Sequence, residues 1–373
     1  MRTKLHELAE IGQSVWCDNL SRRIIESGEL QRLIDLGVAG VTSNPTIFMK
    51  AITGSADYDD AIHAGIDEGV ADSAALYERL AIPDIADAAD LLRPVYDRTS
   101  GADGYVSLEV NPRLADDTKG TIAEARRLFG ELDRPNVFIK VPATDAGVPA
   151  IETLIGEGIN VNVTLIFSVA VHKRVMEAYL AGLRKLNAVG GDLSRVASVA
   201  SFFVSRVDTA VDKLIEKKHG ETKDVERLLG KAAIANADLA YARFREFFDP
   251  SGPFGELKKR GARVQRPLWA STSTKNPAYA DTLYVDNLVA ADTVNTMPPE
   301  TIEAALDHGK IGPKLGDHLD QSREVLAKLG EAGIDLKAVT DQLTIEGVKS
   351  FAKSFDELLS GLSQKQSTVR ASG

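Results

Sequence analysis

Residues 136–164, NVFIKVPATDAGVPAIETLIGEGINVNVT, contain the pattern that decides the fold. Two short β-rich runs, at 136–141 and 159–164, stand on either side of a stretch at 146–157 with helical spacing. Strands joined through a helix pair in parallel by a right-handed crossover, because the chain must return to the same end of the sheet. The segment therefore predicts a β–α–β unit.

The same alternation continues in both directions along the chain. We predict further strands at 14–18, 38–43, 105–109, 196–203, 267–271 and 282–286, which makes eight in all. Helical spacing fills stretches between them, among them 20–29, 121–132, 168–186 and 206–218. This α/β rhythm favours a closed (β/α)8 TIM barrel over an open doubly wound sheet, which has a similar rhythm.

One face of several predicted strands is apolar, and the other turns polar toward the carboxyl end. In 136–141 the polar face holds Lys140, and in 105–109 it holds Glu109. A parallel sheet covered by helices on both faces would be almost continuously apolar. The pattern instead fits a barrel whose mouth holds a site, and the intervening helices disfavour an antiparallel sheet with one solvated face.

The chain reads as one decorated domain. We expect a single barrel over 1–362, with helical insertions at about 46–104 and 209–264. The end of the barrel domain is helical again, and we expect the polar segment 363–373 to be a disordered tail. We find no internal repeat and no low-complexity linker.

Composition excludes several classes of function. The chain of 373 residues has 44 Lys and Arg against 54 Asp and Glu, a formal net charge of -10. This acidic excess argues against nucleic-acid and membrane-surface partners. The single cysteine, Cys17, forms no intrachain disulfide, and neither a signal peptide nor an apolar run of about 18 residues is found. We therefore expect a cytoplasmic protein.

Cofactor and metal motifs are missing from the sequence. The six histidines are scattered, without an HExxH motif or a close pair, which predicts no transition-metal site. No GxGxxG follows a predicted strand, and no GxxxxGK[ST] occurs, so a bound nucleotide cofactor is not expected.

Polar side chains gather at the predicted strand ends. In a barrel they converge at one mouth; they are Asp18, Asn44, Glu109, Lys140, Thr164, Ser201 and Ser271. A lone lysine in an apolar strand commonly extends its amine to solvent. Inside a barrel, burial lowers the pKa of a lysine and yields a neutral amine that attacks carbonyls, whereas nearby carboxylates raise it. The sequence leaves the net pKa of Lys140 open.

Four segments resemble motifs of the transaldolase family, in its longer bacterial form. They are DLGVAGVTSNPTIF at 35–48, VSLEVNPRLA at 106–115, NVFIKVPAT at 136–144 and INVNVTLIFS at 159–168. They occur in the family's order, each at a predicted strand end. The resemblance covers almost the whole chain and implies a (β/α)8 barrel with class I aldolase chemistry, needing neither metal nor cofactor.

The resemblance also implies the reaction. Members of the family transfer a dihydroxyacetone unit from sedoheptulose 7-phosphate to D-glyceraldehyde 3-phosphate. The products are erythrose 4-phosphate and fructose 6-phosphate, in the non-oxidative pentose phosphate pathway. The expected partners are therefore phosphorylated ketoses and aldoses, and the oligomeric state stays open.

Catalytic roles follow from the matching positions. Lys140 matches the Schiff-base lysine, and Asp18 in VWCDNL matches the aspartate that moves the C4 hydroxyl proton. A simpler interpretation makes Asp18 the N-cap of a helix starting at Leu20. Glu109 and Thr164 match a pair that holds a water for proton transfer during imine formation.

Substrate-binding roles are implied in the same way. Asn44 and Asn162 match amides that hold substrate hydroxyls, and Thr42 supports the same region. Arg206 in SFFVSR matches a phosphate-binding arginine, with Ser201 and Ser271 as hydroxyl donors.

Simpler interpretations stay open for three of these residues. Glu109 would form an ion pair with Arg113 at the barrel mouth. Asn44 would serve only the turn before Pro45. Arg206 would be a helix-surface charge beside Asp208.

The sequence departs from the shorter family members after the seventh predicted strand. A second arginine is expected there, but the chain reads LWASTSTKNP at 268–277. Our hypothesis is that Lys275 supplies the missing positive charge.

Two other functions remain open. A related class I Schiff-base aldolase would act on fructose 6-phosphate or a smaller sugar with the same lysine and no obligatory transfer. An inactive barrel scaffold is the other, and the intact catalytic set argues against it. A metal-dependent aldolase would need a ligand cage that the sequence lacks.

Overall fold

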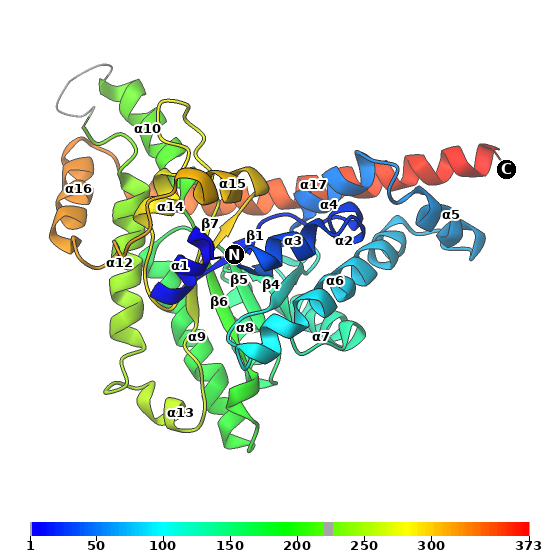
Figure 1. Ribbon diagram of the computed structural model, residues 1–373, viewed down its shortest axis with the longest axis horizontal. Helices are drawn as coiled ribbons and strands as arrows, with labels where there is room; N and C mark the ends of the chain where they lie inside the picture. Colours follow the sequence, from blue (N-terminus) through cyan, green and yellow to red (C-terminus); the bar gives the residue numbers. More distant parts are fainter. Residues whose placement is uncertain (1, 220–226, 373) are drawn as a thin grey trace.

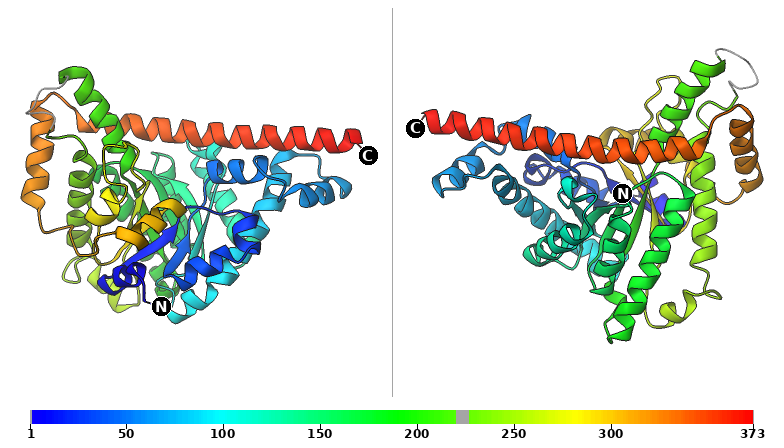
Figure 2. Two further views of the ribbon diagram at one scale, coloured as in Figure 1. Left: turned by 45° about the horizontal axis from the view of Figure 1, so that its top comes forward. Right: turned by 180° about the vertical axis from the view of Figure 1, so that it is seen from behind.

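The computed structural model describes residues 2–219 and 227–372, and it contains a closed barrel of eight parallel strands (Figures 1 and 2). The strands follow chain order around the barrel: β1 (Gln13–Cys17), β2 (Val38–Val41), β3 (Tyr105–Glu109), β4 (Val137–Pro142), β5 (Val161–Ile166), β6 (Ser198–Phe203), β7 (Arg266–Ala270) and β8 (Thr293–Met297). The barrel closes where Gln13 pairs with Thr293. The predicted (β/α)8 fold is confirmed.

Helices surround this barrel and extend it. They are α1 (Lys4–Ile11), α2 (Arg22–Glu26), α3 (Glu29–Asp35), α4 (Pro45–Thr53), α5 (Asp59–Asp67), α6 (Ser73–Arg98), α7 (Thr118–Leu132), α8 (Gly147–Gly156), α9 (Val169–Ala188), α10 (Ser205–His219), α12 (Ala232–Phe247), α13 (Gly255–Lys259), α14 (Leu283–Asn287), α15 (Pro299–His308), α16 (Leu319–Glu331) and α17 (Leu336–Ser372). In the described ranges, no helix is both long and apolar enough to cross a membrane.

The predicted eighth strand was wrong. Residues 282–286 lie in and before helix α14, and the strand that closes the barrel, β8, follows them. A short apolar run such as LYV fits a buried helix as well as a strand. Tyr284 and Val285 are buried residues of helix α14. The Tyr284 hydroxyl donates to Asp208 Oδ2 at 2.9 Å.

Aromatic side chains fill the lower part of the barrel. Trp16 and Phe138 have ring centroids 6.0 Å apart, and Phe138 stacks on Tyr105 at 4.3 Å. Gly40 leaves the room they need, because a Cβ there would lie 2.6 Å from the Trp16 indole. At this level the barrel is therefore a packed core and not an open channel.

The insertions are helical, as their spacing predicted. The segment 46–104 holds α5, α6 and most of α4, while 209–264 holds α12, α13 and most of α10. Residues 220–226 of the second insertion lie outside the described residues. Figure 1 shows α6 beside the lower barrel and α10 on the side away from α5.

The C-terminal segment differs from the expected disordered tail. Helix α17 continues through Ser372, and Figure 2 shows it crossing the molecule from the side of α16 toward α5. Lys365 Nζ pairs with Asp59 Oδ1 at 2.6 Å, and Gln366 Nε2 donates to the Val70 carbonyl at 3.1 Å. These contacts to the first insertion hold a polar segment that composition alone would leave loose.

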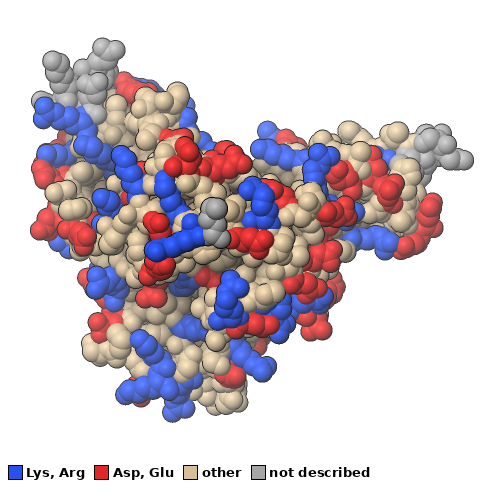
Figure 3. Space-filling view, in the orientation of Figure 1, with Lys and Arg blue, Asp and Glu red and all other residues tan. Residues whose placement is uncertain are grey.

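Charges are well mixed on the surface. Acidic and basic side chains are interspersed over the face seen in Figure 3. The acidic excess therefore forms no single large patch on that face.

Candidate active site

A cavity opens at the carboxyl ends of the strands. It takes in most of the polar residues that the sequence singled out and leaves out Glu109, Asn162 and Lys275. It adds four residues that the sequence did not single out: Phe203, Ala270, Thr296 and Phe351. Its lining consists of Asp18, Thr42, Asn44, Lys140, Thr164, Ser201, Phe203, Arg206, Ala270, Ser271, Thr296 and Phe351.

Lys140 lies on the inner wall of the cavity. Its side chain extends from β4, and the residue is only 5% exposed. Nζ donates to the Ser43 carbonyl at 3.1 Å and lies 3.6 Å from Glu109 Oε2. Nζ is also 5.8 Å from the centroid of the Phe351 ring. The amine is thus held inside the barrel and does not extend to solvent.

Glu109 neighbours Lys140 directly. The β3–β4 register pairs the two residues, and Glu109 is 8% exposed. Burial raises the pKa of Glu109 to about 7, while the Lys140 charge opposes the rise. The alternative partner Arg113 instead bonds Asp356 of α17, so the predicted Glu109–Arg113 ion pair was wrong.

Thr164 brings an unsatisfied hydroxyl to the same wall. It is fully buried, and its Oγ1 has no hydrogen-bond partner within residues 2–219 and 227–372. Glu109 Oε2 likewise has none by hydrogen-bond geometry in those ranges. Because buried polar atoms are nearly always bonded, these two oxygens are available to a water or a substrate.

Asp18 forms the opposite side, at the end of β1. Its Oδ1 accepts a hydrogen bond from Thr42 Oγ1 at 2.7 Å, and Thr42 also bonds Thr296 Oγ1 at 2.8 Å. Burial raises the pKa of the Asp18 carboxyl, with Lys140 and the Thr42 bond opposing the rise. The helix-cap interpretation of Asp18 was wrong, because α2 begins at Arg22 and Ser21 caps it.

A polar layer lies beside Lys140 on the next strands. Asn162 pairs with Lys140 in the β4–β5 register. Its Nδ2 donates to Ser107 Oγ at 3.0 Å, and its Oδ1 accepts from Ser201 Oγ at 2.7 Å. Asn162 is therefore fixed in one orientation.

Asn44 has a structural role and also lines the cavity. Its Oδ1 accepts from the Ile47 amide at 3.0 Å and caps α4, which begins at Pro45. Asn44 therefore caps a helix and does not serve only the turn expected before Pro45, and the same residue lines the cavity.

Arg206 and Ser271 form the rim of the cavity. Arg206 lies in the first turn of α10, with Cζ 5.2 Å from the centroid of Phe203. Burial lowers the pKa of Arg206, but a guanidinium stays charged. The surface-charge interpretation of Arg206 was wrong, since Arg206 is partly buried and Asp208 bonds Ala233 and Tyr284.

Ser271 directly follows β7 and has a left-handed backbone conformation. Its φ is +58°, and its carbonyl accepts from the Ser205 amide at 3.0 Å. The hydroxyls of Ser205 and Ser271 are 2.9 Å apart. Both hydroxyls therefore lie at the start of α10, which begins at Ser205.

Lys275 lies outside the cavity. It is exposed, and Nζ donates to Ser273 Oγ at 2.6 Å. It lines an adjoining groove together with Arg206 and three lysines of α10, namely Lys213, Lys217 and Lys218. The structure thus brings Lys275 near Arg206 without placing it against Lys140.

Sequence reasoning missed Thr296 and Phe351. Thr296 belongs to β8, and the strand was predicted in the wrong segment, so its inward side chain was not considered. Phe351 comes from α17, and no local pattern links a residue of that helix to the strands it crosses.

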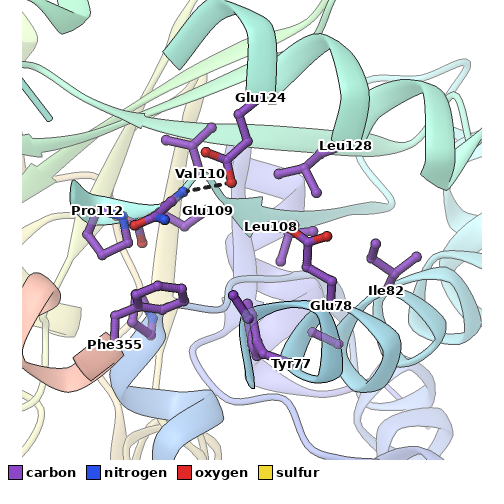
Figure 4. A pocket seen from close by; sticks show the side chains of 14 residues that line it. Tyr77, Glu78, Ile82, Leu108, Glu109, Val110, Pro112, Glu124, Leu128 and Phe355 are labelled. Carbon is purple, nitrogen blue, oxygen red and sulfur yellow. Dashed lines mark hydrogen bonds between the residues drawn. The ribbon is translucent and has the colours of Figure 1, made fainter. Parts of the chain in front are cut away.

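A second pocket lies on the side of β3 that faces α6 and α7 (Figure 4). Tyr77, Glu78, Glu124 and Phe355 are among its lining residues, and Glu124 Oε1 accepts from the Asn111 amide at 3.2 Å. Burial raises the pKa of Glu124. Neither lysine nor arginine lines this pocket in the part of the chain that the structure describes, so it suits an anionic ligand less well than the cavity around Lys140.

The described residues contain no cluster of side chains that could bind a metal ion. Among residues 2–219 and 227–372, no group of three or more His, Cys, Asp and Glu side chains is placed to hold a metal ion.

Comparison with known proteins gives one consistent result. The family Transaldolase/Fructose-6-phosphate aldolase matches residues 15–362. A transaldolase of Saccharopolyspora erythraea is 51% identical over 359 residues, covering 96% of each chain. "Transaldolase 2" of a Nostoc species is 47% identical over 371 residues, covering 97% of each. A transaldolase of Mycolicibacterium smegmatis is 51% identical over 357 residues, covering 95% of each.

Proposed function

The chain belongs to the transaldolase/fructose-6-phosphate aldolase family, and we propose that it works as a transaldolase through a Schiff base on Lys140. It moves a dihydroxyacetone unit from sedoheptulose 7-phosphate to D-glyceraldehyde 3-phosphate and releases erythrose 4-phosphate and fructose 6-phosphate. The observation that carries this proposal is the buried amine of Lys140, 3.6 Å from a carboxylate whose pKa burial raises to about 7.

Imine formation uses Lys140, Glu109 and Thr164. The Lys140 amine attacks C2 of the ketose, and the resulting carbinolamine loses its hydroxyl as water. With a pKa near 7, Glu109 both donates and accepts protons at neutral pH, which suits general acid–base catalysis. The free Oγ1 of Thr164 and Oε2 of Glu109 would hold the water that carries the proton.

Cleavage uses Asp18. The carboxylate takes the C4 hydroxyl proton, the C3–C4 bond breaks, and its electron pair moves through C2 to the iminium nitrogen. The aldose leaves, and an enamine remains on Lys140. Addition of the acceptor aldehyde reverses these steps. Burial makes Asp18 a stronger base than an exposed aspartate, and Thr42 fixes its orientation.

The two ends of the substrate bind at different depths of the cavity. Asn44 and the Asn162–Ser201 pair face the hydroxyls of the three-carbon unit near Lys140. Arg206 and Ser271, at the rim, bind the distal phosphate, because a guanidinium and a hydroxyl suit phosphate oxygens. Lys275 adds positive charge from the adjoining groove.

Borohydride trapping tests the proposal. Reduction in the presence of fructose 6-phosphate should add a three- or six-carbon adduct to Lys140, located by peptide mapping. Lys140→Ala should lose the adduct and nearly all activity, while Lys119→Met on the surface of α7 should keep both. An adduct on another lysine, or none at all, would contradict the mechanism.

Free aldolase activity is the competing function. Both reactions need the same lysine, so only their products distinguish them: the aldolase releases free dihydroxyacetone, whereas the transaldolase transfers it to an acceptor. Coupled assays with and without glyceraldehyde 3-phosphate decide between them: release of free dihydroxyacetone at the full rate without acceptor would favour the aldolase. The cytoplasmic location expected from the sequence stays a prediction.

A further inference from the structure

Strand β5 becomes irregular directly after Val163. Val163 pairs with Ala200 and Ile166 with Phe202, so Thr164 and Leu165 together stand opposite Ser201. This is a β-bulge, a device that redirects side chains and is frequent beside active sites. It places the break in regular pairing at one of the proposed catalytic residues.

The bulge depends on an unfavourable backbone conformation. Leu165 has φ +60°, in the left-handed region that bulky side chains disfavour. Leucine has no short polar side chain to compensate by a local hydrogen bond. Contacts outside the strand must therefore hold Leu165 in place.

Helix α17 supplies that contact at Gly347. A Cβ built on Gly347 would lie 2.8 Å from Cδ2 of Leu165 and 3.4 Å from Cδ1. Leu165 is 1% exposed, so its side chain has little room to move away. Only a glycine at 347 lets the helix rest this closely on Leu165.

The same helix is anchored at the cavity one and two turns further on. Phe351 lines the cavity, and its ring centroid lies 5.8 Å from Lys140 Nζ. Ser354 Oγ and Thr46 Oγ1 are 2.8 Å apart, which ties α17 to α4. The Gly347 contact is therefore one of several contacts that hold α17 beside the cavity at the open end of the barrel.

We propose that Gly347 is a positioning residue for the reaction. It allows α17 to pack on Leu165, and this packing holds the bulge that presents the unpartnered hydroxyl of Thr164 to the cavity. The inference rests on the proposed function, since it assumes that Thr164 takes part in imine formation. Displacement of Thr164 should slow the chemical step and leave substrate binding by Arg206 and Asn44 intact.

Two substitutions at Leu165 and one at Gly347 test the contact in the full chain. Gly347→Ala should lower kcat about tenfold, slow borohydride-trapped imine formation equally, and leave KM within about twofold. Leu165→Ala should do the same, because it loses the contact and keeps the conformational cost. Leu165→Gly, for which a left-handed conformation is easy, should recover a large part of the lost kcat.

A matched control is Gly130→Ala on α7. Nothing lies within 4 Å of a Cβ at that position, and it is a helical glycine like Gly347. It should keep full kcat. The wild-type chain trapped in the same experiment tests the function itself: no adduct on Lys140 would reject the proposed mechanism, whatever the variants do.

Two results would overturn the inference. One is full kcat in Gly347→Ala and Leu165→Ala with only a lower Tm, which would show a purely structural contact. The other is a Leu165→Gly variant no more active than Leu165→Ala. If Gly347→Ala does not fold, the comparison of the two Leu165 variants decides between these outcomes.

Discussion

The inner wall of the cavity and its rim are built from different elements. The wall carries Lys140 on β4 and Thr164 on β5, and Glu109 on β3 lies next to Lys140; all three are less than 10% exposed. The rim carries Arg206 on the first turn of α10, and the exposed Lys275 follows β7 outside the cavity. Burial raises the pKa of Glu109 beside Lys140, so we place the proton transfers at the wall. The rim keeps permanent charges close to solvent, so its task is recognition.

Glu109→Gln probes the wall and should have the largest effect. Glutamine keeps the size of the side chain and cannot exchange a proton, so we expect kcat to fall by roughly 100-fold or more. The pH profile of kcat/KM should lose the apparent pKa near 7 that burial gives Glu109. Steady-state assays between pH 5 and 9 measure both. A kcat within a factor of a few of wild type would remove Glu109 from the proton path.

The same substitution should change how stability depends on pH. Folding raises the pKa of Glu109 from 4.5 to about 7, so the folded state binds the proton more tightly. This stabilisation is complete below about pH 4.5 and is lost as the pH rises to about 7. As the pH rises from 5 to 8, wild type should therefore lose stability relative to Glu109→Gln, whose side chain does not titrate. Urea unfolding at pH 5 and 8 would detect this, and an equal difference at both pH values would contradict it.

Arg206→Met tests the rim and should separate it from the wall. Loss of a charge-assisted phosphate contact is worth roughly 1.5–3 kcal/mol, which raises KM about 10- to 100-fold. The kcat at saturation should change little, because the chemistry takes place at Lys140. Unphosphorylated dihydroxyacetone donors should react equally well with variant and wild type. A loss of kcat that is the same for both donor types would assign Arg206 to the wall.

The sequence predicted the wall far better than the rim. Alternation along 105–109, 136–141 and 159–164 already placed Glu109, Lys140 and Thr164 on inward faces, because the period of a strand determines which face a residue occupies. The family motifs then supplied the roles. Rim positions depend on loops and helix starts, which have no such period.

The pattern of the sequence could not predict contacts between segments that are far apart in the chain. Phe351 reaches the cavity from α17, and Thr296 was missed because a buried helix at 283–287 has the composition of a strand. The segment after 362 reads as disordered from composition, but contacts of Lys365 and Gln366 with the first insertion hold it as a helix. For Phe351 and for the C-terminal segment, the deciding partners lie hundreds of residues away in the chain.

Phe351→Ala tests whether α17 belongs functionally to the wall. The ring centroid lies 5.8 Å from Lys140 Nζ, so removal of the ring should admit water to the enamine. We expect transfer activity to fall several-fold and release of free dihydroxyacetone without acceptor to rise. Phe351→Leu, which keeps an apolar side chain, should stay closer to wild type. If wild type, Phe351→Ala and Phe351→Leu all show the same ratio of transfer to release of free dihydroxyacetone, α17 has only a structural role.

Lys275→Met should have the smallest effect and defines the outer limit of the rim. Lys275 is exposed and bonds Ser273, so solvent screens its charge and the expected rise in KM for phosphorylated substrates is about two- to threefold. The rise should vanish at about 0.5 M salt, where charge interactions are screened within a few ångströms. Lys119→Met, an exposed lysine on α7, is the matched control. An unchanged KM for Lys275→Met at low salt would confine phosphate recognition to Arg206 and Ser271, and the groove beside α10 would then lie outside the active site.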